Sequence, residues 1–243
     1  MKIFVCSDIH GNFRAFEAVL SEYRKGGPYE FLFLGDALGY GTHPDAILDR
    51  LFNLPRSVLL FGNHEWSLFD RAERAEMNDI AMGSILWSER MMGGRYDQRI
   101  GERFQLTAEG RGYIAAHSSP TNPLEWRYVF TSADAAPIFM NHDFRVCFVG
   151  HTHVPMVYTF NDGLMGLPES GTLVLDPGDR YVINPGSVGQ PRDGDSRASF
   201  CIYDPDENRV SFERCRYDVE AEADDIVRAG LDPFLADRLL KGY

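Results

Sequence analysis

The sequence predicts an α/β fold whose first half forms a largely parallel sheet and whose second half is antiparallel. In the first half, short apolar runs alternate with segments of helical periodicity, which is typical of strand–helix–strand units with right-handed crossovers. After His153, strand-like runs follow one another and are separated by turn residues, as in antiparallel sheets. The chain has 243 residues, 44% of them hydrophobic, so it can bury a large core, and we expect residues 1–243 to form one domain.

The first-half strands are expected where apolar residues continue without a break, because such strands are buried on both faces. These runs are residues 2–6, 31–34, 58–61, 146–149 and, with a weaker pattern, 113–116. Helices are expected over 13–23, where apolar residues recur on one face, over 44–52, and over 78–92, which Gly93 and Gly94 end.

The second half combines strands with a final pair of helices. The strands are expected over 154–160, 172–175, 181–183, 198–203 and 209–214, with turn sequences such as Asp204-Pro205-Asp206 between them. The helix pair that follows is broken at Gly230 and restarts with Asp232 as its cap and Pro233 at its first position.

Charge and composition narrow the possible partners. The formal net charge of −12 argues against broad contact with nucleic acid, because neutralising phosphates needs clustered Lys and Arg. A small phosphorylated substrate stays compatible, since bound cations reverse the local field. No apolar stretch approaches the roughly 20 residues of a membrane span, and Asp8 interrupts the first apolar run too early for a signal peptide. The four cysteines form no C-x-x-C pair, so we expect a reduced, cytoplasmic protein.

Five short blocks hold the candidate functional residues, and most of them follow a buried strand directly. The blocks are Asp8-Ile9-His10, Gly35-Asp36, Gly62-Asn63-His64, the single His117, and Gly150-His151-Thr152-His153. Reactive groups gather beyond the carboxyl ends of strands in parallel α/β sheets, so these blocks should converge. We expect Asp8 and His10, like His151 and His153, to point to one side because residues i and i+2 do so on extended backbone.

Each block alone also has an ordinary structural explanation. Asp8 could cap a turn, Gly35-Asp36 and Gly62-Asn63 are common turn sequences, and His117 could be a core histidine bonded to backbone. Together, in this order, they favour a metal centre. A mixture of carboxylate, imidazole and amide ligands suits Mn, Fe or Zn better than Ca or Mg, which prefer oxygen shells.

The order D-x-H, G-D, G-N-H, H, G-H-x-H resembles the calcineurin-like metallophosphoesterases over residues 8–153. The sequences around Gly35-Asp36-Ala37 and Asn184-Pro185-Gly186 resemble the small bacterial and archaeal branch of phosphodiesterases, some of which are diadenosine tetraphosphate hydrolases. The resemblance implies a four-layer αββα sandwich of two mixed β-sheets flanked by helices. It also implies a dimetal-dependent phosphoester hydrolase, most simply a phosphodiesterase or nucleotide phosphohydrolase.

The resemblance further implies a role for each residue of the blocks. One divalent metal would be held by Asp8, His10, Asp36 and His153, and the other by Asp36, Asn63, His117 and His151. A carboxylate can offer one oxygen to each ion, so Asp36 suits the bridge. Two such ions against two carboxylates leave about two positive charges for a phosphate, and a hydroxide shared by the ions would attack phosphorus in line. His64 would stay unligated and stabilise or protonate the leaving oxygen.

Two alternatives stay open beside the phosphodiesterase. One is a phosphomonoesterase, including a protein phosphatase; the protein phosphatase is disfavoured because Gly39-Tyr40-Gly41 supplies no arginine after the second block. A non-catalytic interaction scaffold of the same fold is disfavoured because every expected ligand is present. A closed structural zinc site would need four Cys or His ligands and no bridge.

Three segments outside the blocks were considered for the substrate. Residues 184–197 either present backbone N–H groups to a phosphate, with Arg192 pairing to a phosphate oxygen, or simply connect two strands. Trp66, Trp87 and Trp126 either line a nucleotide-stacking pocket or pack in the core. Residues 65–110 are expected to overhang the site and set substrate choice. The sequence predicts neither the natural substrate nor the oligomeric state.

Overall fold

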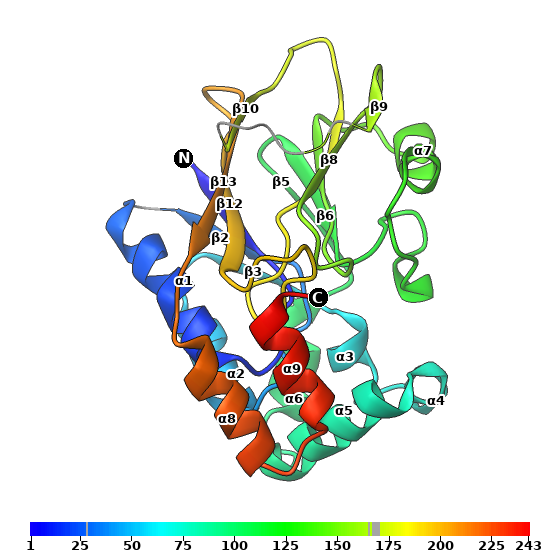
Figure 1. Ribbon diagram of the computed structural model, residues 1–243. Helices are drawn as coiled ribbons and strands as arrows, with labels where there is room; N and C mark the ends of the chain where they lie inside the picture. Colours follow the sequence, from blue (N-terminus) through cyan, green and yellow to red (C-terminus); the bar gives the residue numbers. More distant parts are fainter. Residues whose placement is uncertain (28, 165, 167–170) are drawn as a thin grey trace.

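The computed structural model describes residues 1–27, 29–164, 166 and 171–243, and within them the strands form two mixed sheets (Figure 1). The first sheet has the strand order β10-β13-β12-β1-β2-β3-β4 and the second β5-β6-β7-β11-β8-β9. The first contains β1 (Ile3–Cys6), β2 (Glu30–Phe33), β3 (Ser57–Leu60), β4 (Phe104–Gln105), β10 (Thr172–Val174), β12 (Ala198–Asp204) and β13 (Arg209–Cys215). The second contains β5 (Thr107–Gly110), β6 (Tyr113–Ala116), β7 (Val146–Phe148), β8 (Met156–Thr159), β9 (Gly163–Leu164) and β11 (Tyr181–Asn184).

The helices begin where polar side chains cap their free backbone N–H groups. Asn12, Asp70, Asn78, Asp218 and Asp232 each accept such a hydrogen bond, which satisfies donors that the helix itself leaves unpaired. The helices are α1 (Phe13–Lys25), α2 (Pro44–Asn53), α3 (Asn63–Trp66), α4 (Arg71–Glu76), α5 (Asp79–Met92), α6 (Asp97–Arg103), the 3₁₀ helix η1 (Pro123–Glu125), α7 (Ser132–Asn141), α8 (Val219–Arg228) and α9 (Pro233–Lys241). The predicted helices at 13–23, 44–52 and 78–92 correspond to α1, α2 and α5.

Side chains alternate between the two faces of each strand, and this alternation produces a four-layer αββα sandwich. In β1, Ile3 and Val5 lie between the two sheets, whereas Phe4 and Cys6 pack outward against α1 and α2. The outer face of the second sheet is covered by α7, which stands at the right in Figure 1 and packs on Cys147. This arrangement confirms the predicted pair of mixed sheets flanked by helices.

The parallel strands are divided between the sheets. β1, β2, β3 and β4 are parallel in the first sheet, and β6, β7 and β11 are parallel in the second. The prediction of an antiparallel second half holds for β8, β12 and β13 but is wrong for one side of β11, which pairs in parallel with β7. The reason is that β8 reverses the chain and β11 reverses it again, so β11 runs in the same direction as β7. Among the described residues, no helix is both long and apolar enough to cross a membrane.

Candidate metal centre

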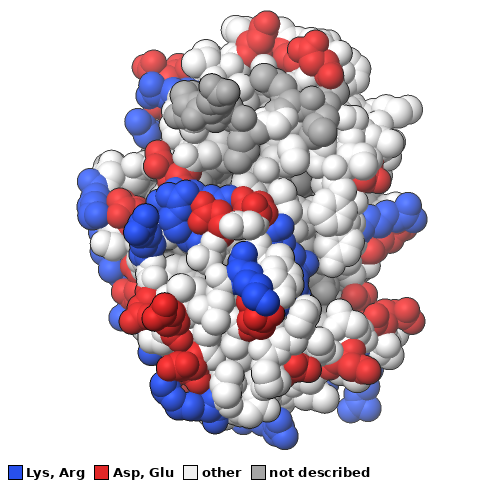
Figure 2. All heavy atoms as spheres, in the orientation of Figure 1, with Lys and Arg blue, Asp and Glu red and all other residues white. Residues whose placement is uncertain are grey.

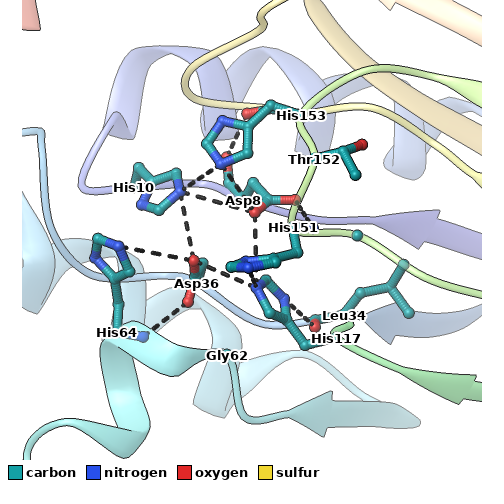
Figure 3. A network of polar contacts seen from close by, with 12 residues as sticks. Asp8, His10, Leu34, Asp36, Gly62, His64, His117, His151, Thr152 and His153 are labelled. Atoms are coloured by element: carbon teal, nitrogen blue, oxygen red, sulfur yellow. Dashed lines mark hydrogen bonds and ion pairs between the residues drawn. The ribbon is translucent and has the colours of Figure 1, made fainter. Parts of the chain in front are cut away.

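The loops after β1, β2, β3, β6 and β7 meet between the ends of the two sheets and bring the five blocks together (Figure 3). Three sets of buried side chains place their ligand atoms within 4.8 Å of one another. These sets are Asp8, His10 and His153; His10, Asp36 and His64; and Asp36, His117 and His151. The predicted convergence is therefore present, although it draws on both sheets and not on one.

Backbone carbonyls fix the orientation of three of the imidazole rings. The Nδ1 atoms lie at hydrogen-bond distance from carbonyl oxygens, 2.9 Å for His10 to Leu38, 2.9 Å for His117 to Leu34, and 2.7 Å for His153 to Gln190. A carbonyl can only accept, so each Nδ1 carries a proton and each ring turns Nε2 toward the cluster, where its neutral form presents a lone pair. Such second contacts orient histidine ligands in metal proteins.

The free ring nitrogens face one another in pairs. Nε2 of His10 lies 3.2 Å from Nε2 of His153, and Nε2 of His117 lies 3.1 Å from Nδ1 of His151. Two lone pairs at this distance repel unless a cation or a proton lies between them. Nitrogens bound to one metal at 2.0–2.1 Å are themselves about 3 Å apart. The spacing of both pairs fits shared metal ligation.

Asp36 lies between the two histidine pairs. Its Oδ2 is 3.6 Å from Nε2 of His10 and 3.4 Å from Nε2 of His117. Asp8 serves mainly one pair, since its Oδ1 is 3.3 Å from Nε2 of His153 and has no hydrogen-bond partner within the described residues. Of the two carboxylates, Asp36 therefore has the position that a bridging ligand requires.

The pKa values of these groups depend on their burial and on the charges of their neighbours. Burial raises the pKa of Asp8 to about 6, with the charge of Asp36 adding to the effect. Although burial lowers it, the carboxylates of Asp36 and Asp8 raise the pKa of His117 to about 9. Although burial raises it, His64 and His117 hold the pKa of Asp36 well below its usual range. The centre thus attracts a positive charge, which is a proton on His117 when no metal is bound.

The third block supplies Asn63 and His64 from the start of α3. The Oδ1 atom of Asn63 is buried and has no hydrogen-bond partner among the described residues, as expected for an oxygen that coordinates a cation. The backbone N–H of His64 donates to Oδ1 of Asp36 over 3.0 Å, and Nε2 of His64 lies 3.9 Å from Oδ2 of the same carboxylate. Burial lowers the pKa of His64, so its protonated form needs a negative charge beside it. The donor set and its unpaired oxygens fit a pair of divalent metals.

The backbone at the blocks is left-handed and not extended, which corrects the expectation from i, i+2 spacing. Asp8, His10, Asp36, His151 and His153 have φ of 55°, 47°, 61°, 66° and 61°. Non-glycine residues seldom adopt this conformation, which costs about 1–3 kcal/mol each and is concentrated at functional sites. The side chains converge because each loop turns sharply at the ligand itself.

Two glycines make room for side chains of neighbouring loops that approach closely. A Cβ atom on Gly62 would lie 2.0 Å from Oδ1 of Asp36, and one on Gly150 would lie 2.0 Å from Oγ of Ser7 and 3.0 Å from Oδ2 of Asp8. The two 2.0 Å contacts are shorter than real Cβ atoms make, so a side chain at either position would displace its neighbours. The space left by each glycine is used by side chains of the site.

Glu65 is a buried residue that the sequence analysis missed. Its carboxylate accepts hydrogen bonds from the backbone N–H groups of Asp36 (2.9 Å), Leu38 (2.9 Å) and Gly62 (3.1 Å). It therefore joins the loop after β2 to the loop after β3 and holds Asp36 in place. Burial and the charge of Asp36 raise the pKa of Glu65 to about 8. The sequence did contain a signal for Glu65, because a carboxylate follows Gly62-Asn63-His64 directly and lies three residues from a helix start.

The segment 184–190 supports the metal loops and does not offer its backbone to a phosphate. The N–H groups of Gly186, Val188, Gly189 and Gln190 donate to Asn184 Oδ1, Ser7 O, Asp8 O and Ser187 Oγ, respectively. The hydroxyl of Ser187 also donates to the carbonyl of Asp8 over 2.8 Å. Of the two alternatives for this segment, these four N–H groups do not support phosphate binding, because each has an acceptor within the protein.

A pocket of about 170 Å³ opens over the cluster. Its lining includes Asp36, Asn63, His64, His151, His153 and Arg192, together with Tyr40, Glu73, Glu76, Met77, Asn78, Ala81, Trp126 and Tyr128. Part of the predicted overhang, α4 and the start of α5, does reach the site. Of the three tryptophans, only Trp126 lines this pocket. Trp66 packs on Phe61, and Trp87 donates its indole N–H to the carbonyl of Ala229.

Comparison with known proteins gives consistent matches. A model of the calcineurin-like phosphoesterase superfamily domain matches residues 1–208. The uncharacterised protein MJ0912 of Methanocaldococcus jannaschii is 31% identical over 246 residues, 99% of this chain and 98% of that protein. The crystal structure of a metallophosphoesterase from Sphaerobacter thermophilus is 34% identical, covers 100% of both chains and has a TM-score of 0.87. Hypothetical protein PH1004 from Pyrococcus horikoshii shares the fold at 18% identity, covering 100% of this chain and 98% of that one, with a TM-score of 0.78.

Proposed function

Because the chain belongs to the calcineurin-like phosphoesterase superfamily, and is therefore a metal-dependent phosphoester hydrolase, we propose that its substrate is a phosphodiester or a nucleotide. The observation that carries this proposal is the position of Asp36 between two histidine pairs, with Arg192 in the same pocket. On another part of the pocket wall lie Glu73 and Glu76. Their carboxylates disfavour a second anionic group there and suit an uncharged alcohol or nucleoside, as in a diester.

We assign the ligands to two sites that share Asp36. Asp8, His10, Asp36 and His153 would hold one ion, and Asp36, Asn63, His117 and His151 would hold the other. The ligand set suits Mn, Fe or Zn. When bound, two such ions would activate a water molecule and offset the charge that develops on phosphorus oxygens.

The remaining side chains would bind the phosphate and the leaving group. Arg192 lines the pocket, and a guanidinium can hold two phosphate oxygens at once. We assign His64 to the leaving oxygen, because it is buried in the pocket wall beside Asp36. A bound phosphate would favour the protonated form that this role needs, and such a step contributes about 10²- to 10⁴-fold in rate.

The test is hydrolysis of bis-p-nitrophenyl phosphate and of p-nitrophenyl phosphate by chelator-stripped protein with and without Mn²⁺. We expect metal to restore turnover and the diester to be preferred. Preference for the monoester would replace the proposal with a phosphomonoesterase, and no turnover of either ester with two metals bound would favour a scaffold. On a diester with a poor leaving group, His64→Asn should lower kcat, whereas His43→Asn, a histidine at the start of α2, should not.

The domain organisation and the cellular compartment of the enzyme are part of the same proposal. We propose that residues 1–243 act as one domain and that the protein is cytoplasmic. All four cysteines are free, and three are buried, which supports a reducing compartment. Acidic and basic side chains are interspersed on the face shown in Figure 2, which supports a small substrate over an extended nucleic acid.

A further inference from the structure

Within the described part of the chain, the ring of His64 lacks the hydrogen bond to a backbone carbonyl that fixes three other histidines of the centre. Its Nδ1 atom is buried, and no described residue forms a hydrogen bond with it. Burial lowers the pKa of His64 and the carbonyl of Leu38 partly offsets this, but that carbonyl accepts its 2.9 Å hydrogen bond from His10. The second side-chain torsion of a histidine is broad, so an unbonded ring turns unless its neighbours pack against it. Packing must therefore set the direction in which Nε2 of His64 points.

Tyr40 provides this packing on one side of the ring. The centroid of the tyrosine ring lies 4.9 Å from that of His64 with the planes at 69°, an edge-to-face contact, and 4.5 Å from that of His10. The two histidine rings, which Figure 3 shows beside each other, are 4.7 Å apart, so all three rings are in contact. Tyr40 is only 8% exposed and lines the metal pocket together with His64.

The backbone on either side of Tyr40 closes around His64 and is bonded to the loop of His10. A Cβ atom on Gly39 would lie 2.3 Å from Nδ1 of His64, so the bare backbone of this glycine lies against the edge of the ring. The N–H of Gly41 donates to the carbonyl of His10 over 2.9 Å. Tyr40 itself has a φ of 61°, a left-handed conformation that bulky residues seldom adopt. Such backbone is concentrated at functional sites, where the surrounding structure holds a side chain in one direction.

We propose that Tyr40 is a positioning residue that holds the imidazole of His64 toward the leaving group of the substrate. Without the tyrosine ring, the imidazole has space to turn, and Nε2 faces the leaving oxygen for a smaller part of the time. This inference rests on the role of His64 in the proposed function. Tyr40 should therefore matter for substrates with poor leaving groups and much less for those with good ones, because a good leaving group departs without a proton.

The experiment compares two diesters on the Mn²⁺-loaded protein, diphenyl phosphate and bis-p-nitrophenyl phosphate. They have the same skeleton, but phenol is a poorer leaving group than p-nitrophenol. The measured quantity is the ratio of kcat for diphenyl phosphate to kcat for bis-p-nitrophenyl phosphate. Tyr40→Leu should lower this ratio about 10- to 100-fold, because misplacing a catalytic group by roughly 1 Å costs about 100-fold in rate.

Tyr128→Leu is the matched control. The ring of Tyr128 lines the same pocket and stacks on the proposed metal ligand His151, with 4.2 Å between the centroids. Its removal takes an aromatic ring from a ligand of the centre without exposing the ring of His64, so the ratio of the two kcat values should stay as in the wild type. Calorimetry with Mn²⁺ and thermal unfolding show whether each variant binds metal and folds.

Three further variants separate positioning from other effects. Tyr40→Phe keeps the ring and should keep the wild-type ratio. Tyr40→Gly removes the ring with a residue that suits a φ of 61°, so it replaces Tyr40→Leu if the latter does not fold or bind metal. The double variant of Tyr40→Leu and His64→Asn should have the ratio of His64→Asn alone, because a residue that acts only through His64 has no effect in its absence.

The outcomes distinguish this inference from the proposed function. An unchanged ratio in folded, metal-loaded Tyr40→Leu or Tyr40→Gly would overturn the inference. So would a fall in Tyr40→Phe as large as in Tyr40→Leu, which would assign the effect to the hydroxyl, or a further fall in the double variant. An unchanged ratio in His64→Asn would instead overturn the proposed role of His64, and absence of any metal-dependent hydrolysis would overturn the proposed function.

Discussion

The base and the rim of the substrate pocket are built in different ways. The base consists of Asp8, His10, Asp36, His117, His151 and His153, none of which is more than 6% exposed. These residues follow strands of both sheets, and backbone groups hold most of them in place. The rim includes the half-buried Arg192, which lies in the loop after β11, together with Glu73 and Glu76 of α4. The base thus follows from the fold, and we propose that the peripheral elements of the rim select the substrate.

The base and the rim should also differ in how well they tolerate substitutions. The base uses left-handed backbone and contacts that leave no space for a Cβ atom, so small changes there should disable the centre. At the rim, Nε of Arg192 is buried without an acceptor in the described part of the chain, so changes there should alter affinity for particular substrates. The predictions below test this contrast.

The largest effect is expected for Asp36→Asn at the base. Loss of the carboxylate that lies most nearly between the two histidine pairs should weaken Mn²⁺ binding by more than about 100-fold, beyond the range seen for residues that merely support ligands. Hydrolysis of bis-p-nitrophenyl phosphate should fall with it. Asp45→Asn, on the exposed start of α2, is the control. Retention of two tightly bound metals in Asp36→Asn would contradict the account.

Glu65→Gln tests whether the base depends on its backbone supports. The amide has one acceptor oxygen where the carboxylate receives three N–H donors, so Asp36 should lose its fixed position. Metal affinity should fall about 10- to 100-fold. Calorimetry with Mn²⁺ measures it, and an affinity equal to that of the wild type would show that Glu65 does not position Asp36.

The affinity of the base for metal should rise with pH. The pKa of His117 is about 9 and that of Asp8 about 6 in the metal-free centre, and the metal must displace these protons. Between pH 6 and 9 one proton is released from His117, so affinity should increase about tenfold for each pH unit. Below pH 6 the metal affinity should depend more steeply on pH, because Asp8 must then release a proton as well. Calorimetry at several pH values would reveal a flat profile if His117 were already neutral.

The smallest effect concerns the attachment of the C-terminal helix pair, α8 and α9. Nδ1 of His43 lies 3.7 Å from the buried carboxylate of Glu222 on α8, and this contact raises the pKa of His43. A raised pKa stabilises the fold fully below pH 6.5 and is lost as the pH rises through the folded-state value. The stability difference between wild type and His43→Gln should be larger at pH 5.5 than at pH 8.5. We expect less than about 1 kcal/mol, because His43 is partly exposed and solvent screens the pair. Chemical denaturation at both pH values measures it, and an equal difference at the two would exclude this contact.

The sequence allowed the base to be predicted better than the rim, for physical reasons. Buried parallel strands appear as continuous apolar runs, and ligand residues directly after them converge on one edge. The left-handed backbone at Asp8 and His10 was not foreseen, since non-glycine residues rarely adopt it. Glu65 was missed because two of its three donors come from a loop far away in sequence.

The central claim is that Asp36 joins two metal sites, and electron paramagnetic resonance of the Mn²⁺-loaded protein tests it most directly. The account predicts the exchange-coupled spectrum of a pair of Mn²⁺ ions when two equivalents are bound. It also predicts that Asp36→Asn removes this coupling while Asp45→Asn retains it. A spectrum of isolated Mn²⁺ at all loadings of the wild-type protein would contradict a shared centre.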